Sequence, residues 1–214
     1  MQLKVIKNFL IDLDGVILDL KYDNFFWKEH IPKIYSKLHK MSYKEAQTIT
    51  KQIFNYKKKT MDWYDINYWS NMLSLDVYKE KENNIERIAL INGSKNFLED
   101  LIQHDKNLYL ITNAHPKTLQ IKLKKYNIRK YFKSIICSHE LKYIKEESQF
   151  WYILKNKLNI RFEDSVLIED SLDNLVAAQS AGLKNLVYVS KKSPQSMTVK
   201  PLTIEYLSDL SSAL

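Results

Sequence analysis

The stretch FLIDLDGVILDL, residues 9–20, runs three apolar residues directly into Asp12 and places Asp14 two residues later. The apolar residues predict a buried strand, and the glycine after Asp14 predicts a tight turn. Two carboxylates this close raise each other's pKa unless a cation lies beside them. Either both acids lie in water at a strand end, or this stretch contributes to a cation-binding site.

Short apolar runs rich in Ile, Leu and Val recur after residue 100, and helical patterns separate them. Trp151, Leu154 and Leu158 show the spacing of three and four residues that is typical of a helix. Strands that alternate with helices form parallel βαβ units, with helices on both faces of the sheet. We therefore expect an α/β fold, with a Rossmann-like three-layer core around a parallel sheet. The predicted strands cover 9–11, 107–112, 133–138, 165–170 and 185–190.

Residues 20–88 interrupt this alternation and carry only helical patterns, including a predicted capping box that begins at Ser42. Residues 22–78 contain 13 of the 26 aromatic residues of the chain, which is enough for a small separate core. We expect an inserted α-helical cap domain at 20–88. The remaining segments, 1–19 and 89–214, would form the α/β core domain.

The net charge of +8, from 33 basic and 25 acidic residues, raises the possibility of an anionic partner. Only three of the basic residues are Arg, however, and Arg makes the commonest base-specific contact with DNA. We therefore expect a small anionic substrate and no nucleic acid. A noncatalytic nucleic-acid-binding protein is kept as a remote alternative.

Cellular location is predicted from what the chain lacks. No apolar run approaches the roughly 20 residues that span a bilayer, and the first residues do not have the pattern of a signal peptide. The single cysteine, Cys137, rules out an internal disulfide and is expected to be a buried, inert thiol. We expect a cytoplasmic monomer or homodimer with no membrane partner.

Polar residues follow three of the predicted strands at their carboxyl ends, where open parallel sheets bind ligands. Carboxylates that converge there need a compensating cation, and oxygen ligands of this kind suit Mg²⁺ together with substrate phosphate. The sequence therefore predicts a magnesium-dependent phosphoryl chemistry. The polar residues are Asp12, Asp14, Thr112, Asn113, Glu169 and Asp170.

Four segments in this order, DLDGV, LITN, a later Lys, and LIEDS followed by AAQSAG, resemble the four motifs of the haloacid dehalogenase (HAD) superfamily. The helical insertion resembles the C1-type cap of that superfamily. The stretches DLKYDNFFWKEHIP, DWYDINYWSNML, LITNAHPKTLQIKL and KEESQFW also resemble bacterial GMP/IMP 5′-nucleotidases of this superfamily. The resemblance implies a Mg²⁺-dependent phosphatase of purine nucleoside 5′-monophosphates. A phosphatase or phosphomutase acting on a sugar phosphate, phosphoglycolate or another small metabolite is the alternative.

The resemblance also implies catalytic roles. Asp12 would be the nucleophile that forms an aspartyl phosphate, and Asp14 would be the general acid and base. Thr112 and Asn113 would bind phosphoryl oxygens, although this pair alone fits an ordinary strand-to-loop transition equally well.

A lysine would balance the charge of the phosphoryl group and the nucleophile. Lys145 is preferred over Lys142, because the acidic turn and helical pattern after Lys145 resemble the third motif. Many relatives carry proline immediately before this lysine, whereas this chain has Ile144, which predicts a less constrained loop.

For the metal, the resemblance implies Asp12, the main-chain carbonyl of Asp14, and Asp170 as ligands of Mg²⁺. Glu169 would contribute directly or through water. Acids at a helix N-terminus are an alternative explanation for Glu169 and Asp170, because the helix dipole favours them there.

Five residues are candidates for contacts with the ribose or base of the substrate. Asp23 could instead cap a helix, Trp27 could belong to the core of the cap, and His115 could be a solvated loop residue. The candidates are Tyr22, Asp23, Asn24, Trp27 and His115.

Overall fold

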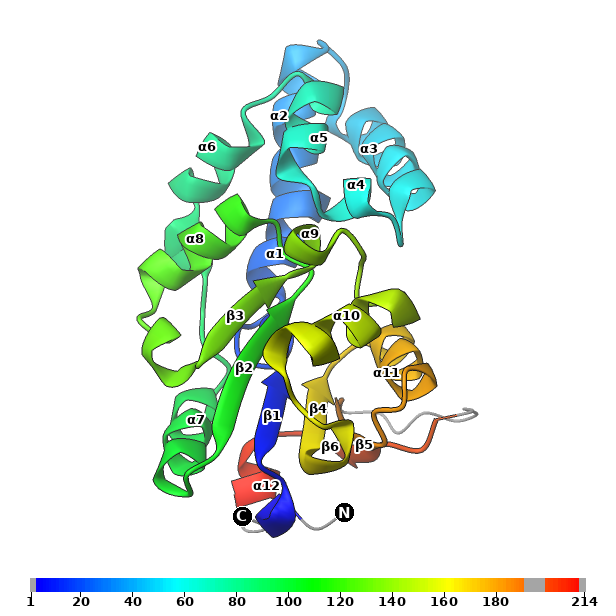
Figure 1. Ribbon diagram of the computed structural model, residues 1–214. Helices are drawn as coiled ribbons and strands as arrows, with labels where there is room; N and C mark the ends of the chain where they lie inside the picture. Colours follow the sequence, from blue (N-terminus) through cyan, green and yellow to red (C-terminus); the bar gives the residue numbers. More distant parts are fainter. Residues whose placement is uncertain (1–2, 191–198, 212–214) are drawn as a thin grey trace. The chain divides into compact units, whose positions relative to one another are not determined.

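The computed structural model describes residues 3–190 and 199–211 and contains a six-stranded parallel sheet (Figure 1). The strand order is β3-β2-β1-β4-β5-β6, so the chain builds outward from β1 to β3 and then returns to the other side of β1. Ligands of open α/β sheets bind at such a reversal, which here lies between β1 and β4. The strands are β1 (Asn8–Ile11), β2 (Asn107–Thr112), β3 (Ser134–Cys137), β4 (Ser165–Glu169), β5 (Asn185–Val189) and β6 (Leu202–Ile204).

The register of the central strands aligns their carboxyl ends. Ile11, the last residue of β1, pairs with Leu110 of β2 and with Ile168 of β4. The ladder continues one residue further, because the Asp12 main-chain N–H donates to the Ile168 carbonyl oxygen at 3.0 Å. Asp12 and Glu169 are therefore forced to the same end of adjacent strands.

Helices cover both faces of this sheet, so all four residues of β1 are buried. The face that carries Leu10 packs against α10 (Ser148–Leu158) and α11 (Leu172–Ser180), which lie on the same side of the sheet in Figure 1. Elsewhere α7 (Ser94–Gln103) packs against β2 and α12 (Ser208–Ser211). The predicted α/β class, with a three-layer core around a parallel sheet, is confirmed.

Strand β6 is the element of the sheet that the pattern did not predict. It contains three residues, and Leu202 is 46% exposed, so it has too few buried apolar positions to mark a strand. The described residues also contain the short helix α9 (Ser138–Leu141) and four 3₁₀ turns. The turns are Leu3–Val5, Ile85–Arg87, Arg129–Tyr131 and Phe162–Asp164.

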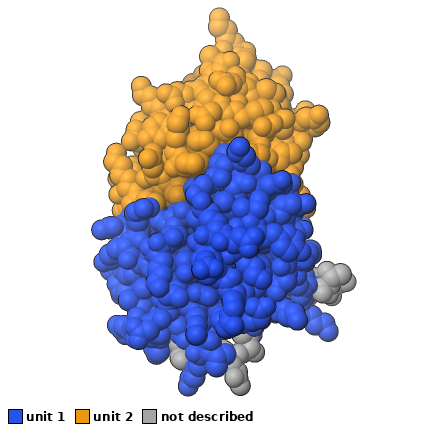
Figure 2. Space-filling view, viewed as in Figure 1, with its two compact units in different colours: residues 1–19, 90–113, 126–214 blue, residues 20–89, 114–125 orange. Residues whose placement is uncertain are grey.

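Contacts divide the chain into two compact units, which are coloured separately in Figure 2. Unit 1 comprises residues 1–19, 90–113 and 126–214, and unit 2 comprises 20–89 and 114–125. The predicted domain limits stay a prediction. Unit 2 contains α1 (Lys21–Phe25), a π-helical turn (Phe26–His30), α2 (Ile31–Leu38), α3 (Tyr43–Lys57), α4 (Met61–Tyr64), α5 (Ile66–Leu73), α6 (Val77–Asn83) and α8 (Pro116–Lys125).

Unit 2 has its own aromatic core. The rings of Phe54 and Trp69 meet edge to face at 5.0 Å, and Phe26 is fully buried in the same cluster. The predicted capping box is present, since the Ser42 hydroxyl accepts from the Glu45 main chain and the Glu45 carboxylate accepts from the Ser42 N–H. Within the described ranges, every helix is too short or too polar to span a bilayer.

Candidate active site

A buried lysine joins the carboxyl ends of β1 and β4. Lys145, 1% exposed, places its Nζ 2.5 Å from Asp12 Oδ1 and 2.6 Å from Glu169 Oε2, and donates to the Ile111 carbonyl oxygen at 3.0 Å. The contact with Glu169 is an ion pair whose angles depart from those of a hydrogen bond. The ammonium therefore donates two hydrogen bonds, to Asp12 and to the Ile111 carbonyl oxygen, and pairs with Glu169 by charge.

Asp170 lies directly against the backbone of the turn that follows Asp12. A Cβ at Gly15 would come within 1.9 Å of Asp170 Oδ2, and Gly15 has a φ of +89°. Only glycine adopts this conformation readily and leaves room for the carboxylate. The glycine of the opening motif therefore brings the chain after Asp14 onto the acidic end of β4.

The charges of this cluster do not balance. Burial and Glu169 raise the pKa of Asp12 to about 7, although Lys145 acts in the opposite direction. Burial, Glu169 and Asp12 raise the pKa of Asp170 to about 9. Burial alone would lower the pKa of Lys145, but Asp12 and Glu169 outweigh it and hold that pKa above its usual value. One ammonium thus faces more negative charge than it can neutralise.

The carboxylates fit a divalent cation. One oxygen each from Asp12, Glu169 and Asp170 lies within 4.8 Å of the others. With Lys145 charged, three ionised carboxylates leave a net charge of −2, and an all-oxygen set of this kind suits Mg²⁺. The Glu169 carboxylate also accepts hydrogen bonds from the backbone: its Oε1 accepts from the main-chain N–H groups of Asp170 and Ser171 at 3.0 Å.

The other predicted catalytic residues belong to the same end of the sheet. Asp14 lies half-buried in the turn after β1, and Thr112, the last residue of β2, is 1% exposed. Asn113, which follows it, is also buried. Lys142 is exposed and ends α9 in a left-handed conformation, so of the two candidate lysines it is Lys145 that lies among the carboxylates.

The loop that carries Lys145 is held by bonds that the sequence did not predict. Ile144, where many relatives have proline, donates its N–H to Glu147 Oε2 at 2.9 Å. The indole N–H of Trp151 donates to the Lys145 carbonyl oxygen at 2.7 Å. Glu147 binds an N–H that a proline at position 144 would lack, and the expectation of a less constrained loop stays a prediction.

The five predicted substrate contacts all belong to unit 2. Asp23 is held by two lysines, with Oδ1 2.9 Å from Lys81 Nζ and Oδ2 2.7 Å from Lys122 Nζ. Burial opposes ionisation of Asp23, but Lys122 and Lys81 outweigh it and hold its pKa well below its usual value. Asp23 does not cap α1, whose N-cap is Leu20. The sequence missed this triad, because its members lie 58 and 99 positions apart.

The neighbours of Asp23 differ in exposure. Tyr22 is 2% exposed and donates its hydroxyl to the Lys81 carbonyl oxygen at 2.9 Å, whereas Asn24 is exposed. Trp27 is half-buried against the aromatic core of unit 2, and its ring meets that of Phe54 edge to face. The alternative that placed Trp27 in this core agrees with its packing.

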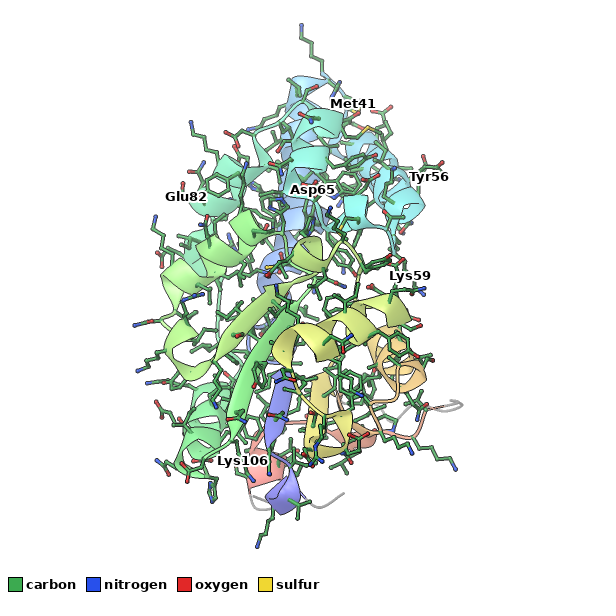
Figure 3. The ribbon with its side chains drawn as sticks, in the orientation of Figure 1. Met41, Tyr56, Lys59, Asp65, Glu82 and Lys106 are labelled. Carbon is green, nitrogen blue, oxygen red and sulfur yellow. The ribbon has the colours of Figure 1, made fainter. Side chains whose placement is uncertain are left out.

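His115 forms a second group within unit 2. Its Nε2 lies 3.0 Å from Asn67 Nδ2 and 3.5 Å from Asp65 Oδ1, and its Nδ1 accepts from the Lys117 main chain. Lys117 Nζ in turn donates to Asn67 Oδ1. Asp65, labelled in Figure 3, caps the N-terminus of α5. His115 is therefore a buried, hydrogen-bonded residue rather than a solvated one.

Comparison with known proteins shows the family of the chain. Residues 9–188 match the family model of haloacid dehalogenase-like hydrolases. The chain belongs to this family. The predicted resemblance and the prediction of an enzyme, a hydrolase, are thereby confirmed.

Individual relatives include phosphatases of two kinds. The GMP/IMP nucleotidase YrfG of Escherichia coli is 30% identical over 175 residues, which cover 82% of this chain and 79% of that protein. A phosphorylated carbohydrates phosphatase of Thermotoga maritima is 23% identical, covering 83% and 82%. The crystal structure of a HAD phosphatase from Thermococcus onnurineus has a TM-score of 0.84 at 22% identity, covering 97% of each chain.

Replacing Asp23 with asparagine leaves two buried ammonium groups facing an uncharged side chain. Removing one member of a buried ion pair typically costs about 3–5 kcal/mol, so Asp23→Asn should lower the free energy of unfolding by that order. Asp62→Asn is the matched control, because Asp62 pairs with Lys57 at 2.7 Å but is 44% exposed. Exposed pairs contribute at most about 1 kcal/mol. Urea unfolding measures both, and equal losses in the two variants would contradict the assigned role of the triad.

In the presence of a chelator, the stability of the folded protein should fall as the pH rises. An aspartate of the unfolded chain has a pKa of about 4, below the values of about 7 for Asp12 and about 9 for Asp170. The folded chain therefore binds these protons more tightly, and that stabilisation is lost as the pH rises through 7 and 9. Mg²⁺ should raise the Tm more at about pH 8.5 than at about pH 5.5, because it competes with the same protons.

The Asp170→Asn variant is the control for this pH dependence. Its Tm in chelator should fall less between these pH values, since the group with the larger shift is absent. A wild-type Tm in chelator that is constant or rises over this range would contradict the raised pKa values.

Proposed function

We propose that this hydrolase is a Mg²⁺-dependent phosphatase of purine nucleoside 5′-monophosphates, GMP and IMP, acting through an aspartyl phosphate. The observation that carries the proposal is the position of Asp12. It lies at the reversal of the strand order, with one oxygen fixed by a buried lysine and two further acids beside it. This arrangement suits a charged nucleophile that attacks an anionic substrate.

In the first step Asp12 attacks the phosphorus atom of the ester. In the described part of the chain, Asp12 Oδ1 accepts a hydrogen bond from Lys145 Nζ, so Oδ2 would be the oxygen that attacks. The bond from phosphorus to the 5′-oxygen breaks, and Asp14 supplies the proton that the leaving alcohol needs. Asp12 and Asp14 both follow β1 directly, two positions apart, so one short segment carries the nucleophile and the acid.

In the second step Asp14, now ionised, takes a proton from water as the water attacks phosphorus. The bond between phosphorus and Asp12 breaks, which restores the Asp12 carboxylate and releases inorganic phosphate. Thr112, at the end of β2, would donate to phosphoryl oxygens in both steps. Lys145 stabilises the ionised carboxylate of Asp12 each time it is formed, because the ammonium is already in place.

Asp12, Asp170 and the main-chain carbonyl of Asp14 would hold Mg²⁺. Of the two alternatives for Glu169, a contribution through water is favoured, since both of its oxygens already have partners. The cation would neutralise charge on the phosphoryl group. The protein's own part is to keep three acids close together in a buried site.

The substrate is supported by similarity. The relative at 30% identity is a GMP/IMP nucleotidase, and the match covers 82% of this chain. The second candidate is a small phosphorylated carbohydrate, which the relative named a phosphorylated carbohydrates phosphatase favours at 23% identity. A cytoplasmic enzyme without nucleic acid or membrane partners is part of the proposal, as is a monomeric or homodimeric state.

Release of inorganic phosphate from a panel of monophosphates tests the function. The panel contains GMP, IMP, AMP, a hexose phosphate and phosphoglycolate, each with Mg²⁺ and with chelator. We expect hydrolysis of GMP and IMP that requires Mg²⁺ and is abolished by Asp12→Asn, because asparagine cannot form the acyl phosphate. Activity confined to the hexose phosphate or phosphoglycolate would contradict the nucleotide substrate. No hydrolysis, together with salt-dependent oligonucleotide binding, would favour the noncatalytic alternative.

A further inference from the structure

The side chain of Asn113 is bound to the lysine loop. Its Oδ1 accepts from the main-chain N–H of Lys145 at 3.0 Å, and its Nδ2 donates to Glu146 Oε2 at 2.9 Å. All three residues belong to unit 1, and Asn113 is 8% exposed. An asparagine amide has one carbonyl oxygen and one NH₂ group. The carbonyl oxygen and one of the two N–H donors of this amide are thus bonded to two consecutive residues of one loop.

These bonds complete a set that fixes the main chain of Lys145. Asn113 binds its N–H and Trp151 binds its carbonyl oxygen, so both polar groups of its main chain have partners. The side chain then extends to the carboxylates, where the ammonium donates to Asp12 Oδ1 and to the Ile111 carbonyl oxygen and forms an ion pair with Glu169. A shift of the main chain would disturb all three contacts together. The position of the ammonium therefore depends on the bonds at the backbone.

We propose that Asn113 and Glu146 form a positioning pair that holds Lys145 on the nucleophile, and that the Asn113 side chain is not a phosphate ligand. The family resemblance implies instead that Asn113 contacts phosphoryl oxygens, as Thr112 would. The two roles make different demands on the side chain. A phosphate ligand must present an N–H to the substrate, whereas a positioning residue needs an acceptor for Lys145 and a complementary partner at residue 146.

An exchange of donor and acceptor separates the two roles. Asn113→Asp keeps an oxygen for the Lys145 N–H but sets a second carboxylate against Glu146. Glu146→Gln keeps an oxygen that can accept from Asn113. In the double variant, the new amide at position 146 donates to the new carboxylate at position 113, which restores the bond with reversed polarity. The total charge of the pair is −1 in both the wild type and the double variant.

Steady-state kinetics with the preferred monophosphate measures the effect of these three variants on catalysis. Asn113→Asp should lower kcat by about 10- to 100-fold, the usual effect of losing a residue that orients an active-site group. KM and the inhibition constant of inorganic phosphate should change by less than about threefold, since a positioning residue does not touch the ligand. Glu146→Gln keeps an acceptor for Asn113 and is the reference, and the kcat of the double variant should lie within about threefold of the kcat of Glu146→Gln.

A phosphate-binding role of Asn113 predicts a different result. If Asn113 bound the phosphoryl group, Asn113→Asp would place a negative charge against it, and both KM and the inhibition constant of phosphate would rise. Glu146→Gln could not remove that repulsion, so the double variant would be as inactive as Asn113→Asp. Failure of the double variant to recover, with all variants folded by circular dichroism, would overturn the positioning role.

A second measurement does not depend on catalysis. Amide hydrogen exchange of the peptide that contains Lys145 should be about tenfold faster in Asn113→Ala, because the N–H loses its acceptor. Glu140→Ala is the matched control, since it removes an exposed carboxylate of the same unit that pairs with Lys157. Unchanged exchange in Asn113→Ala would contradict the pair.

The kinetic readout rests on the proposed phosphatase function, whereas the exchange readout does not. Faster exchange in a protein that hydrolyses no monophosphate would support the pair and contradict the function. Unchanged exchange in Asn113→Ala of an active phosphatase would contradict the pair and support the function.

Discussion

The contact of one buried ammonium with carboxylates from two adjacent strands is the interaction on which this site depends. Sheet topology forces Asp12 and Glu169 together at the reversal between β1 and β4, and burial makes their charges costly. Lys145 offsets part of that cost, and its loop must therefore lie where the ammonium can reach both carboxylates. Gly15, whose missing side chain admits Asp170, is a consequence of the same crowding.

Most of the sheet could be predicted from the sequence. All of its strands except β6 are mainly apolar runs followed by polar residues. The acids after β1 and β4 could be predicted for the same reason, since the carboxyl ends of parallel strands meet. The partners of Asn113 and Asp23 could not be predicted. Their bonds join residues 32 to 99 positions apart, and nothing distinguishes Lys81 or Lys122 from the other 28 lysines.

The two units use charge in different ways. In unit 1 one lysine lies among an excess of carboxylates, which together could hold a cation. In unit 2 one carboxylate serves two buried lysines, and the rings of Tyr22 and Phe26 also lie within 5 Å of Lys81. Asp23 therefore supports the packing of α1, α6 and α8, whereas its predicted contact with substrate stays a prediction. A sequence motif alone would not separate these two functions of an aspartate.

In the proposed mechanism Asp12 becomes covalently phosphorylated during turnover. Acid quenching during steady-state hydrolysis of GMP with Mg²⁺, followed by borohydride reduction and peptide mass spectrometry, measures this most directly. Borohydride reduces an acyl phosphate but leaves a free carboxylate unchanged, so the modified residue identifies the nucleophile. We expect reduction at Asp12 in the wild type and at no residue in Asp12→Asn. Reduction at Asp14 or Asp170, or none in an enzyme that is turning over, would contradict this mechanism.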